Sequence, residues 1–426
     1  MRNGLLWFAA YAGCVASVII FATAGGVTYI REGAVWTAKE AQTAAAFFVV
    51  SITAAQIQDT YRSQRSQTSN TNSGSLTSAV KKVRVFIVPG HQPEEGGTEF
   101  GDLYERNVVV DIADALYTLF AQNPHYEVMV ARTKTAWNPI LQNYFDTHAL
   151  EIETFKQSQA VQMADYIASG RFILEDDQVY HNNASSRATL QLYGINKWSS
   201  DNKYDITLHV HLNDYAGRRA KRVGIYDGFT IYVPDHQYSN AVASKTVGEA
   251  IAARLNAYHA TSTLSIEDRG VVEDRELIAT GSNNSVDGVA LLIEYGYIYE
   301  PQFQKSSVRK VAIADYAYQT YLGLQDFFED SVPSTFGSVS FPYNWNHVDA
   351  KKEESGPGIY ALQAALHHLG FYPPVGKSFS LCPVSGRVGS CTRTAIEEYQ
   401  SAHGIEATGM LGPRTRTALA HDLAIP

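Results

Sequence analysis

Between residues 83 and 328 the chain alternates short apolar runs with segments whose apolar residues recur every three or four positions. The short runs predict strands at 83–88, 126–131, 204–211, 228–233 and 289–295. The helical spacing predicts helices near 105–120, 145–168, 183–197, 239–257 and 306–327. Strands that alternate with helices are typical of an α/β domain, here expected as a mixed, mostly parallel sheet with flanking helices.

The N-terminal stretch has a different pattern. Residues 5–24 carry no charged side chain, and about twenty apolar residues are enough to cross a bilayer as a helix. We therefore predict a transmembrane helix that anchors the chain, or a signal segment, over residues 1–30. Cleavage after Ala24, in the small-residue context ATA, would release the protein instead. Either way, most of the chain leaves the cytoplasm.

Changes in amino-acid composition along the remaining residues predict how the chain is divided into helices, linkers and domains. An Ala-rich helix is predicted over 31–62, where the apolar run AAAFFVVSI is short for a second membrane pass. A polar tract without periodicity predicts a flexible linker over 63–82. The α/β domain spans 83–328, and a stretch rich in Ser, Pro, Gly and charge predicts a second linker over 329–355. A small all-α domain is expected over 356–426.

Residues that can carry chemistry lie where the predicted strands end. The run VFIVPGH delivers His91 at the carboxyl end of a buried strand, where open α/β sheets place their ligands. Glu105 opens the next helix, HVHLND carries His209 and His211, and LLIEYGY carries Glu294. A zinc hydrolase needs three protein ligands, an open position for water and a carboxylate that takes the proton. His91, Glu105 and His211 fit the ligand role. Glu294 fits the general base.

These motifs resemble the zinc-dependent N-acetylmuramoyl-L-alanine amidases of the amidase-3 type. VFIVPGH is followed by a YERN glutamate fourteen residues after its histidine, then by HVHLND and LLIEYGY, and the resemblance covers most of residues 83–328. It implies His91, Glu105 and His211 as the zinc ligands. It implies Glu294 as the general base.

Other positions agree with this family or depart from it. Arg132, in VARTKT, lies where the family has a Thr-Arg pair and is expected to bind substrate. Asn213 is expected to hold the loop or to bind substrate. His209 stands where the family usually has Ser and could compete as a ligand, but Asn213 follows His211 at the family's offset, which favours His211. The stretch 134–186 is longer than the family core requires. It is expected to be a helical insertion that caps the site, binds an activator protein or only adds packing.

The closing residues carry a second set of motifs. YALQAALHHLGFYPP, GRVGSCTRTAIEEYQSAHGI and ATGMLGPRTRTALAHDL follow one another within 356–426. They resemble the peptidoglycan-binding domain 1 family, which implies a small three-helix domain that binds peptidoglycan. Cys382 and Cys391 flank a short turn and would form a disulfide in an oxidising compartment, but would be free thiols in the cytosol.

The sequence therefore predicts a zinc enzyme of the bacterial cell envelope, extracytoplasmic, anchored to the membrane or secreted. Its expected reaction is cleavage of the amide between N-acetylmuramic acid and L-alanine in peptidoglycan. The alternatives are a zinc peptidase that cuts stem peptides with the same ligands, and a non-catalytic, membrane-tethered wall-binding protein. Peptidoglycan and the membrane are the expected partners. Nucleic acid is excluded, because a net charge of −9 and a pI of about 5.8 leave no basic surface for it.

Overall fold

The computed structural model describes residues 19–23, 26–31, 34–36, 54–68, 81–174, 184–280, 288–328 and 355–423. The chain divides into two compact units, Met1–Ser51 and Ile52–Pro426. In the first unit, an antiparallel sheet is formed by β1 (Ile19–Thr23), β2 (Gly26–Arg31) and β3 (Ala34–Trp36).

The transmembrane helix predicted over 1–30 is not found. Its residues 19–23 and 26–30 belong to strands, and most of its other residues lie outside the described part of the chain. Within the described ranges, no helix is both long enough and apolar enough to cross a membrane. The physical reason for the discrepancy is that an apolar run indicates burial without selecting helix over strand, and the run contains β-branched Val, Ile and Thr residues, which favour strands.

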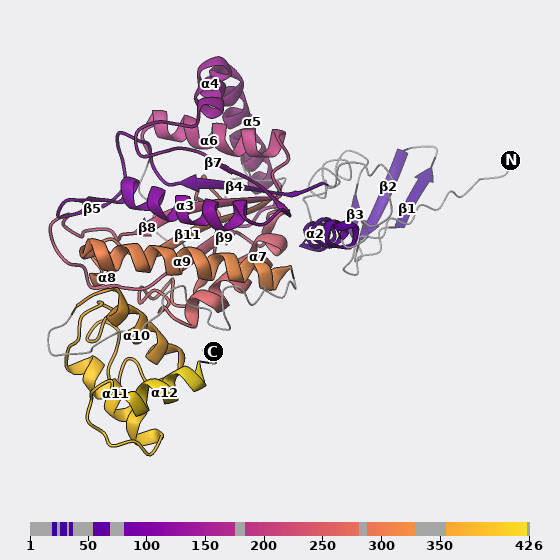
Figure 1. Ribbon diagram of the computed structural model, residues 1–426. Coiled ribbons are helices and arrows are strands. Elements are labelled where there is room, and N and C mark those ends of the chain that lie inside the picture. The colour runs from indigo at the N-terminus through magenta and orange to yellow at the C-terminus, as the bar shows by residue number, and fades with distance from the viewer. Residues whose placement is uncertain are drawn as a thin grey trace. The chain divides into compact units, whose positions relative to one another are not determined.

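The second unit is built on a six-stranded sheet with the order β10-β9-β11-β8-β4-β7 (Figure 1). Its strands are β4 (Val83–Pro89), β7 (Tyr126–Val130), β8 (Ile206–Asn213), β9 (Thr230–Pro234), β10 (Val271–Asp274) and β11 (Val289–Tyr297). Strands β11, β8, β4 and β7 are parallel, and β9 runs antiparallel to β11. The predicted mixed, mostly parallel sheet is confirmed.

Helices cover both faces of this sheet (Figure 1). They are α3 (Glu105–Ala121), α4 (Pro139–Thr147), α5 (Ala149–Ala168), α6 (Ser186–Asp201), α7 (Ala241–Asn256), α8 (Pro301–Gln304) and α9 (Ser306–Phe327). Successive residues of a strand point to opposite faces. In β4, Val85 and Ile87 therefore join the core with α3, α7 and α9, whereas Phe86 and Val88 join the core with α4, α5 and α6.

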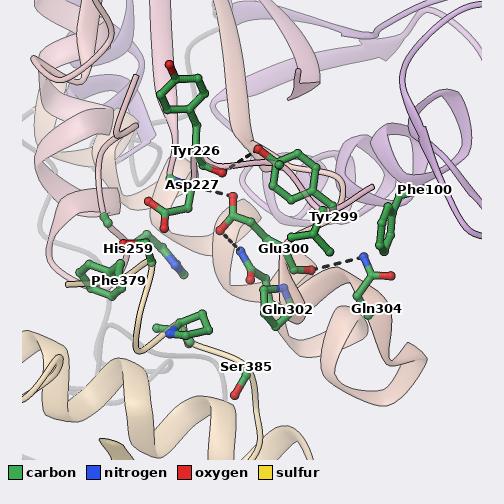
Figure 2. Close-up of a pocket in the computed structure, with 18 of the residues that line it drawn as sticks. Phe100, Tyr226, Asp227, His259, Tyr299, Glu300, Gln302, Gln304, Phe379 and Ser385 are labelled. Carbon is green, nitrogen blue, oxygen red and sulfur yellow. Dashed lines mark hydrogen bonds between the residues drawn. The ribbon is translucent and has the colours of Figure 1, made fainter. Parts of the chain in front are cut away.

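The predicted three-helix domain follows, with α10 (Pro357–His368), α11 (Ser390–Ala402) and α12 (Pro413–Asp422). Helix α10 packs against α9, and its Tyr360 is fully buried in the same core as Tyr316. The Lys305 ammonium donates to the carbonyl and hydroxyl oxygens of Ser355, at 3.0 and 2.7 Å. A cavity lies between this domain and the α/β domain (Figure 2). Of the linker predicted over 329–355, only Ser355 is within the described residues.

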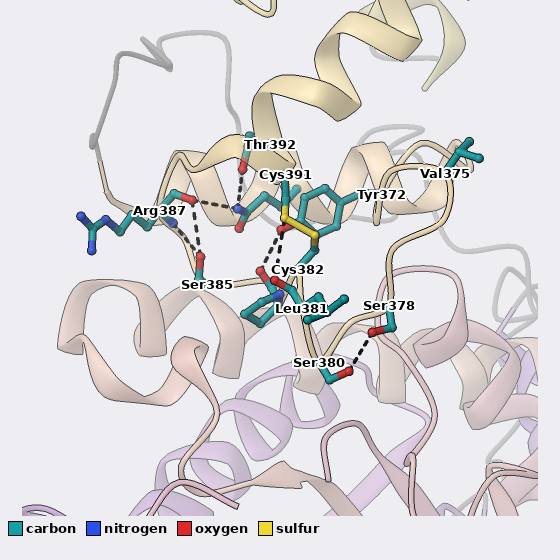
Figure 3. Close-up of a disulfide and its surroundings, with 12 residues drawn as sticks. Tyr372, Val375, Ser378, Ser380, Leu381, Cys382, Ser385, Arg387, Cys391 and Thr392 are labelled. Carbon is teal, nitrogen blue, oxygen red and sulfur yellow. Dashed lines mark hydrogen bonds between the residues drawn. A yellow bond between two sulfur atoms is a disulfide. The ribbon is translucent and has the colours of Figure 1, made fainter. Parts of the chain in front are cut away.

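The predicted disulfide between Cys382 and Cys391 is present, with the two Cα atoms 5.7 Å apart (Figure 3). Cys391 is in the first turn of α11, and Cys382 is buried in the loop before it. Beside the bond, the Tyr372 hydroxyl donates to the carbonyl oxygen of Pro383 at 2.8 Å. The disulfide therefore ties the loop that lines the cavity to a helix.

Helix α2 (Ala54–Thr68) belongs to the second unit. Its Ile57 and Tyr61 are fully buried, and the Tyr61 ring stacks on Phe328 with ring centres 4.3 Å apart. The Tyr61 hydroxyl donates to the side-chain oxygen of Gln325 at 3.1 Å. Because α2 includes residues 63–68, the linker predicted over 63–82 begins later than expected, and its residues 69–80 lie outside the described part.

We expect Tyr61→Ala to lower the free energy of unfolding of the full chain by about 3 kcal/mol, because a large buried side chain is removed and a buried hydrogen bond is lost. Urea unfolding followed by tryptophan fluorescence measures this change. Asp59→Ala is the matched control on the exposed side of α2, where the Asp59 carboxylate lies 3.7 Å from the surface guanidinium of Arg62. Equal urea midpoints of unfolding for both variants would show that α2 adds nothing to the stability of the α/β domain.

Candidate metal centre

Strand β4 ends at Pro89 and places His91 at the carboxyl edge of the sheet. The Gly90 N–H donates to the Val210 carbonyl of β8 at 2.8 Å, which holds this turn against the neighbouring strand. His91 has a φ of 67°, a conformation that residues other than glycine rarely adopt. Its ring centre lies 4.9 Å from that of His211. Backbone strain of this kind is typical of functional sites.

Glu105, the first residue of α3, joins the segments around it. Its Oε1 lies 2.8 Å from His91 Nε2 and 3.1 Å from His211 Nδ1. The same oxygen accepts the Leu212 N–H at 3.0 Å, and Oε2 accepts the Thr98 N–H at 2.9 Å. The residue is only 2% exposed. Burial raises the pKa of Glu105, but the charges of the two histidines and their hydrogen bonds outweigh burial, so the pKa is lowered overall.

The side chains of His91, Glu105 and His211 have the arrangement that a metal ion requires. One ligand atom from each lies within 4.8 Å of the others. His91 Nε2 is buried 2.8 Å from Glu105 Oε1 and has no other partner in the described residues. Burial lowers the pKa of His211, which favours the neutral ring that metals bind. Two imidazoles and one carboxylate are a known ligand set of catalytic zinc sites, and these residues fit zinc.

Two glycines allow the backbone to come close to these ligands. A Cβ atom at Gly90 would lie 2.3–2.6 Å from three atoms of the His211 ring. Gly97 has a φ of 82°, and a Cβ atom there would lie 2.9 Å from the His91 ring and 3.0 Å from Glu105 Oε2. Both positions therefore require glycine for the ligands to keep their places.

Glu294, the predicted general base, lies on β11 directly opposite His211 of β8. Its Oε2 is buried and has no hydrogen-bond partner. Burial raises the pKa of Glu294, and the nearby charges of Glu105, Glu267 and Asp214 raise it further. A carboxyl group whose pKa is raised in this way is better suited to accept a proton than an ordinary surface carboxylate.

The competing histidine, His209, lies deeper in the sheet. It pairs with Val88 of β4 and Leu292 of β11, and it is fully buried. Neither ring nitrogen has a hydrogen-bond partner, and burial lowers the pKa of His209 to about 3. The structure thus brings His211, and not His209, to Glu105.

Arg132 has a different place from the one expected. It is 1% exposed, and its Nε donates to the Pro89 carbonyl at 3.2 Å. Its Nη2 donates to the carbonyl oxygens of Gly90 and, at 2.9 Å, of Arg106. Because these bonds bury the guanidinium behind the turn that carries His91, Arg132 holds this turn in place of the expected substrate contact.

Asn213 is also buried, and its amide donates to Glu267 Oε2 at 2.8 Å. Glu267 further accepts the hydroxyls of Tyr232 and Ser262, both at 2.5 Å. The structure therefore supports the loop-holding alternative for Asn213. No sequence signal identified Glu267, because a lone glutamate in a loop is usually exposed.

Three residues that the sequence did not predict for the site form hydrogen bonds that hold Glu105 in position. Thr98, whose N–H binds Glu105, donates its hydroxyl to Asp214 Oδ2 at 2.5 Å. Arg218 Nε donates to Asp214 Oδ1 at 2.5 Å, and its Nη2 lies 2.6 Å from the Thr98 hydroxyl. Such outer hydrogen bonds orient metal ligands. The spacing of Asp214 and Arg218 indicates an ion pair, but nothing in the sequence places Thr98 beside it.

Comparison with known proteins identifies two families in the chain. Residues 85–326 match the family described as N-acetylmuramoyl-L-alanine amidase, and residues 355–419 match a family described as a peptidoglycan binding domain. No curated protein matches the chain.

Similar solved structures are named as amidases. The N-acetylmuramoyl-L-alanine amidase of Clostridium difficile 630 is 17% identical, covers 57% of this chain and 97% of its own, and has a TM-score of 0.35. Ami1 of Mycobacterium smegmatis is 13% identical, covers 58% of this chain and 99% of its own, and has a TM-score of 0.36. CwlD of Clostridioides difficile, in complex with the GerS lipoprotein, is 14% identical, covers 57% of this chain and 98% of its own, and has a TM-score of 0.36.

The amidase match spans more than half of the 426 residues and contains the whole cluster around Glu105. It decides for an amidase over the peptidase and the non-catalytic wall-binding protein. The chain belongs to the N-acetylmuramoyl-L-alanine amidase family, carries a C-terminal peptidoglycan-binding domain and hydrolyses amide bonds of peptidoglycan.

Proposed function

We propose that this amidase is zinc-dependent, with His91, Glu105 and His211 as the ligands and Glu294 as the general base. The bond cleaved is the amide between N-acetylmuramic acid and L-alanine. The observation that carries the proposal is the convergence of three ligand atoms within 4.8 Å, beside a buried carboxyl group whose Oε2 has no partner.

Each side chain has a defined task in this proposal. Bound zinc would polarise the scissile carbonyl and lower the pKa of a water molecule. Glu294 takes the proton of that water at its unpaired Oε2 and then donates it to the leaving amine of L-alanine. Thr98 and Leu212 hold the Glu105 carboxylate with their N–H groups, so that it stays ionised and fixed as a ligand.

The enzyme works outside the cytoplasm, in the cell envelope, where its polymeric substrate is found. The disulfide Cys382–Cys391 supports an oxidising compartment. The C-terminal domain raises the concentration of the catalytic domain on the wall, because both are part of one chain. Attachment to the membrane through residues 5–24 stays a prediction.

We also propose that α4 and α5, within the insertion predicted over 134–186, bind an activator protein. Leu150 is 81% exposed and Val161 is 70% exposed on α5. Eleven residues are about three helical turns, so both side chains lie on the same exposed face. Exposed apolar side chains grouped in this way mark contact surfaces.

Glu294→Gln is expected to slow the release of stem peptides from purified peptidoglycan by a factor of about 10²–10⁴, because the proton acceptor is lost. Mass spectrometry of the products measures the rate, and the zinc content should equal that of the wild type. Glu94→Gln, at an exposed glutamate of the loop after His91, is the matched control and should keep the wild-type rate. A wild-type rate for Glu294→Gln would rule out this base.

Gly90→Ala is expected to abolish zinc binding while leaving the fold intact, because the added Cβ would collide with the His211 ring. Elemental analysis of the purified protein measures the zinc, and circular dichroism checks the fold. In the control Gly389→Ala, the backbone φ of −123° suits any residue and the new Cβ meets no atom within 4 Å, so zinc should be retained. Full zinc occupancy in Gly90→Ala would contradict the proposed ligand set.

Leu150→Ser with Val161→Ser is expected to keep the activity of the purified enzyme but to remove its stimulation by an envelope extract of the source bacterium. Peptide release with and without extract measures the stimulation. The control Thr154→Val with Gln157→Leu makes the same face more apolar and should retain it. Equal stimulation of the serine variant and the wild type would place the activator elsewhere.

A further inference from the structure

A cavity of about 510 Å³ lies between the α/β domain and the C-terminal domain (Figure 2). Its walls come from the loop before β9, from the turn between β11 and α9, and from the disulfide-bonded loop of the C-terminal domain. None of the four residues assigned to the metal centre lines it. The cavity is therefore separate from the candidate metal centre.

The two domains hold the walls of this cavity in fixed positions. Gly386 has a φ of 66°, and a Cβ atom there would lie 2.7 Å from Val308 of α9. The rings of Tyr258 and His368 stack at 4.9 Å with an angle of 14° between their planes. Close packing on both sides means that the cavity is a formed space and not a gap between loosely joined parts.

Two carboxyl groups line the cavity. Glu300 is fixed by its neighbours: Oε1 accepts the N–H groups of Tyr297 at 2.6 Å and Gly228 at 3.1 Å, and Oε2 accepts the Gln302 amide at 2.9 Å. Asp227, beside it, has an Oδ1 without any hydrogen-bond partner. Leaving a buried carboxylate oxygen unpaired is costly unless a ligand completes it.

Among the described residues, no lysine or arginine that lines the cavity forms an ion pair with either of these two groups. Of the lysine and arginine residues that line the cavity, Lys305 is bonded to Ser355, and the exposed Arg387 forms no ion pair with either carboxyl group in the described residues. Burial raises the pKa of Asp227, and it raises the pKa of Glu300 to about 7. A positively charged group that entered the cavity would therefore be favoured by both.

Aromatic rings line the space around the carboxyl groups. Tyr299, Tyr226 and Phe379 are part of the lining, and the Tyr299 hydroxyl is fixed by donating to the Tyr226 carbonyl at 2.7 Å (Figure 2). Aromatic faces combined with carboxylates are the environment that binds ammonium groups. A volume of this size suits a ligand of a few amino-acid residues.

We propose that this cavity binds a short peptide through a side-chain ammonium group, which pairs with Asp227 and Glu300 between the two domains. Such a peptide occurs either still attached to the glycan or already released. Because the released form has no scissile amide, its binding does not depend on zinc or Glu294, so this proposal and the proposed mechanism can fail separately.

The test is isothermal titration calorimetry of the full chain with Nα-acetyl-Ala-Glu-Lys and with the same peptide acetylated at Nε. The free ammonium form should bind, and Nε-acetylation should weaken binding by about tenfold, since a charged hydrogen bond is lost. Asp227→Asn should weaken binding of the ammonium form by a similar factor and make the two peptides equal. Glu249→Gln, at an exposed glutamate of α7, is the matched control and should bind as the wild type does.

A second variant tests the site from the other domain. Ser385→Trp should fill the cavity and remove binding of both peptides, with circular dichroism unchanged. Titration with the same peptide linked to N-acetylmuramic acid tests whether the cavity binds the wall-attached form or the released form. Mass spectrometry checks that the linked peptide is not cleaved during the titration. Whichever of the two forms binds, its affinity should depend on the free ammonium group. Failure of both forms to bind, equal affinity with and without the ammonium group, or unchanged binding in Ser385→Trp would overturn the proposal.

Discussion

The buried carboxylate of Glu105 is the group on which the candidate metal centre depends. A carboxylate that is almost without solvent contact is stable only if every lone pair finds a donor or a cation. Here the donors come from the loop at Thr98 and from β8 at Leu212, and the two histidines come from the ends of β4 and β8. The ends of these two strands and the start of α3 are therefore held in one place by a single side chain.

The charges around Glu105 explain why the site suits a metal ion. Burial raises the pKa of Glu294, and the charges of Glu105, Glu267 and Asp214 raise it further, so negative charge accumulates at this edge of the sheet. The two arginines nearby are already committed, Arg132 to backbone carbonyls and Arg218 to Asp214. Among the described residues, no lysine or arginine forms an ion pair with Glu105 or Glu294, and a divalent ion would supply the missing positive charge.

The sequence was most informative where hydrophobic pattern alone determines structure. Helix α9 was predicted with its observed bounds, and the central strands within a few residues, because their apolar runs are long and buried. Strand β10 was missed, since its four residues VVED show no clear alternation. The apolar N-terminal run indicated burial but could not distinguish a helix from the observed strand β1.

The candidate site was predictable in its residue types but not in its depth. The period of two along β8 put His209 and His211 on one face, yet only the position of the strand in the sheet buries His209 between β4 and β11. For the same reason Arg132 could be identified as important but not as buried. A sequence shows which residues of a strand share a face of the sheet. Whether such a residue is buried depends on the strands and helices that pack around it in the fold.

The contact between the two domains changes how wall binding can assist catalysis. Domains joined by a small polar contact reorient freely, but here Tyr316 of α9 and Tyr360 of α10 share one continuous apolar core. A C-terminal domain held in this way presents the candidate metal centre to the wall in one orientation. Binding of the polymer then restricts the direction from which the scissile amide approaches the catalytic domain, in addition to raising its local concentration. Tethering and positioning thus follow from the same packed interface.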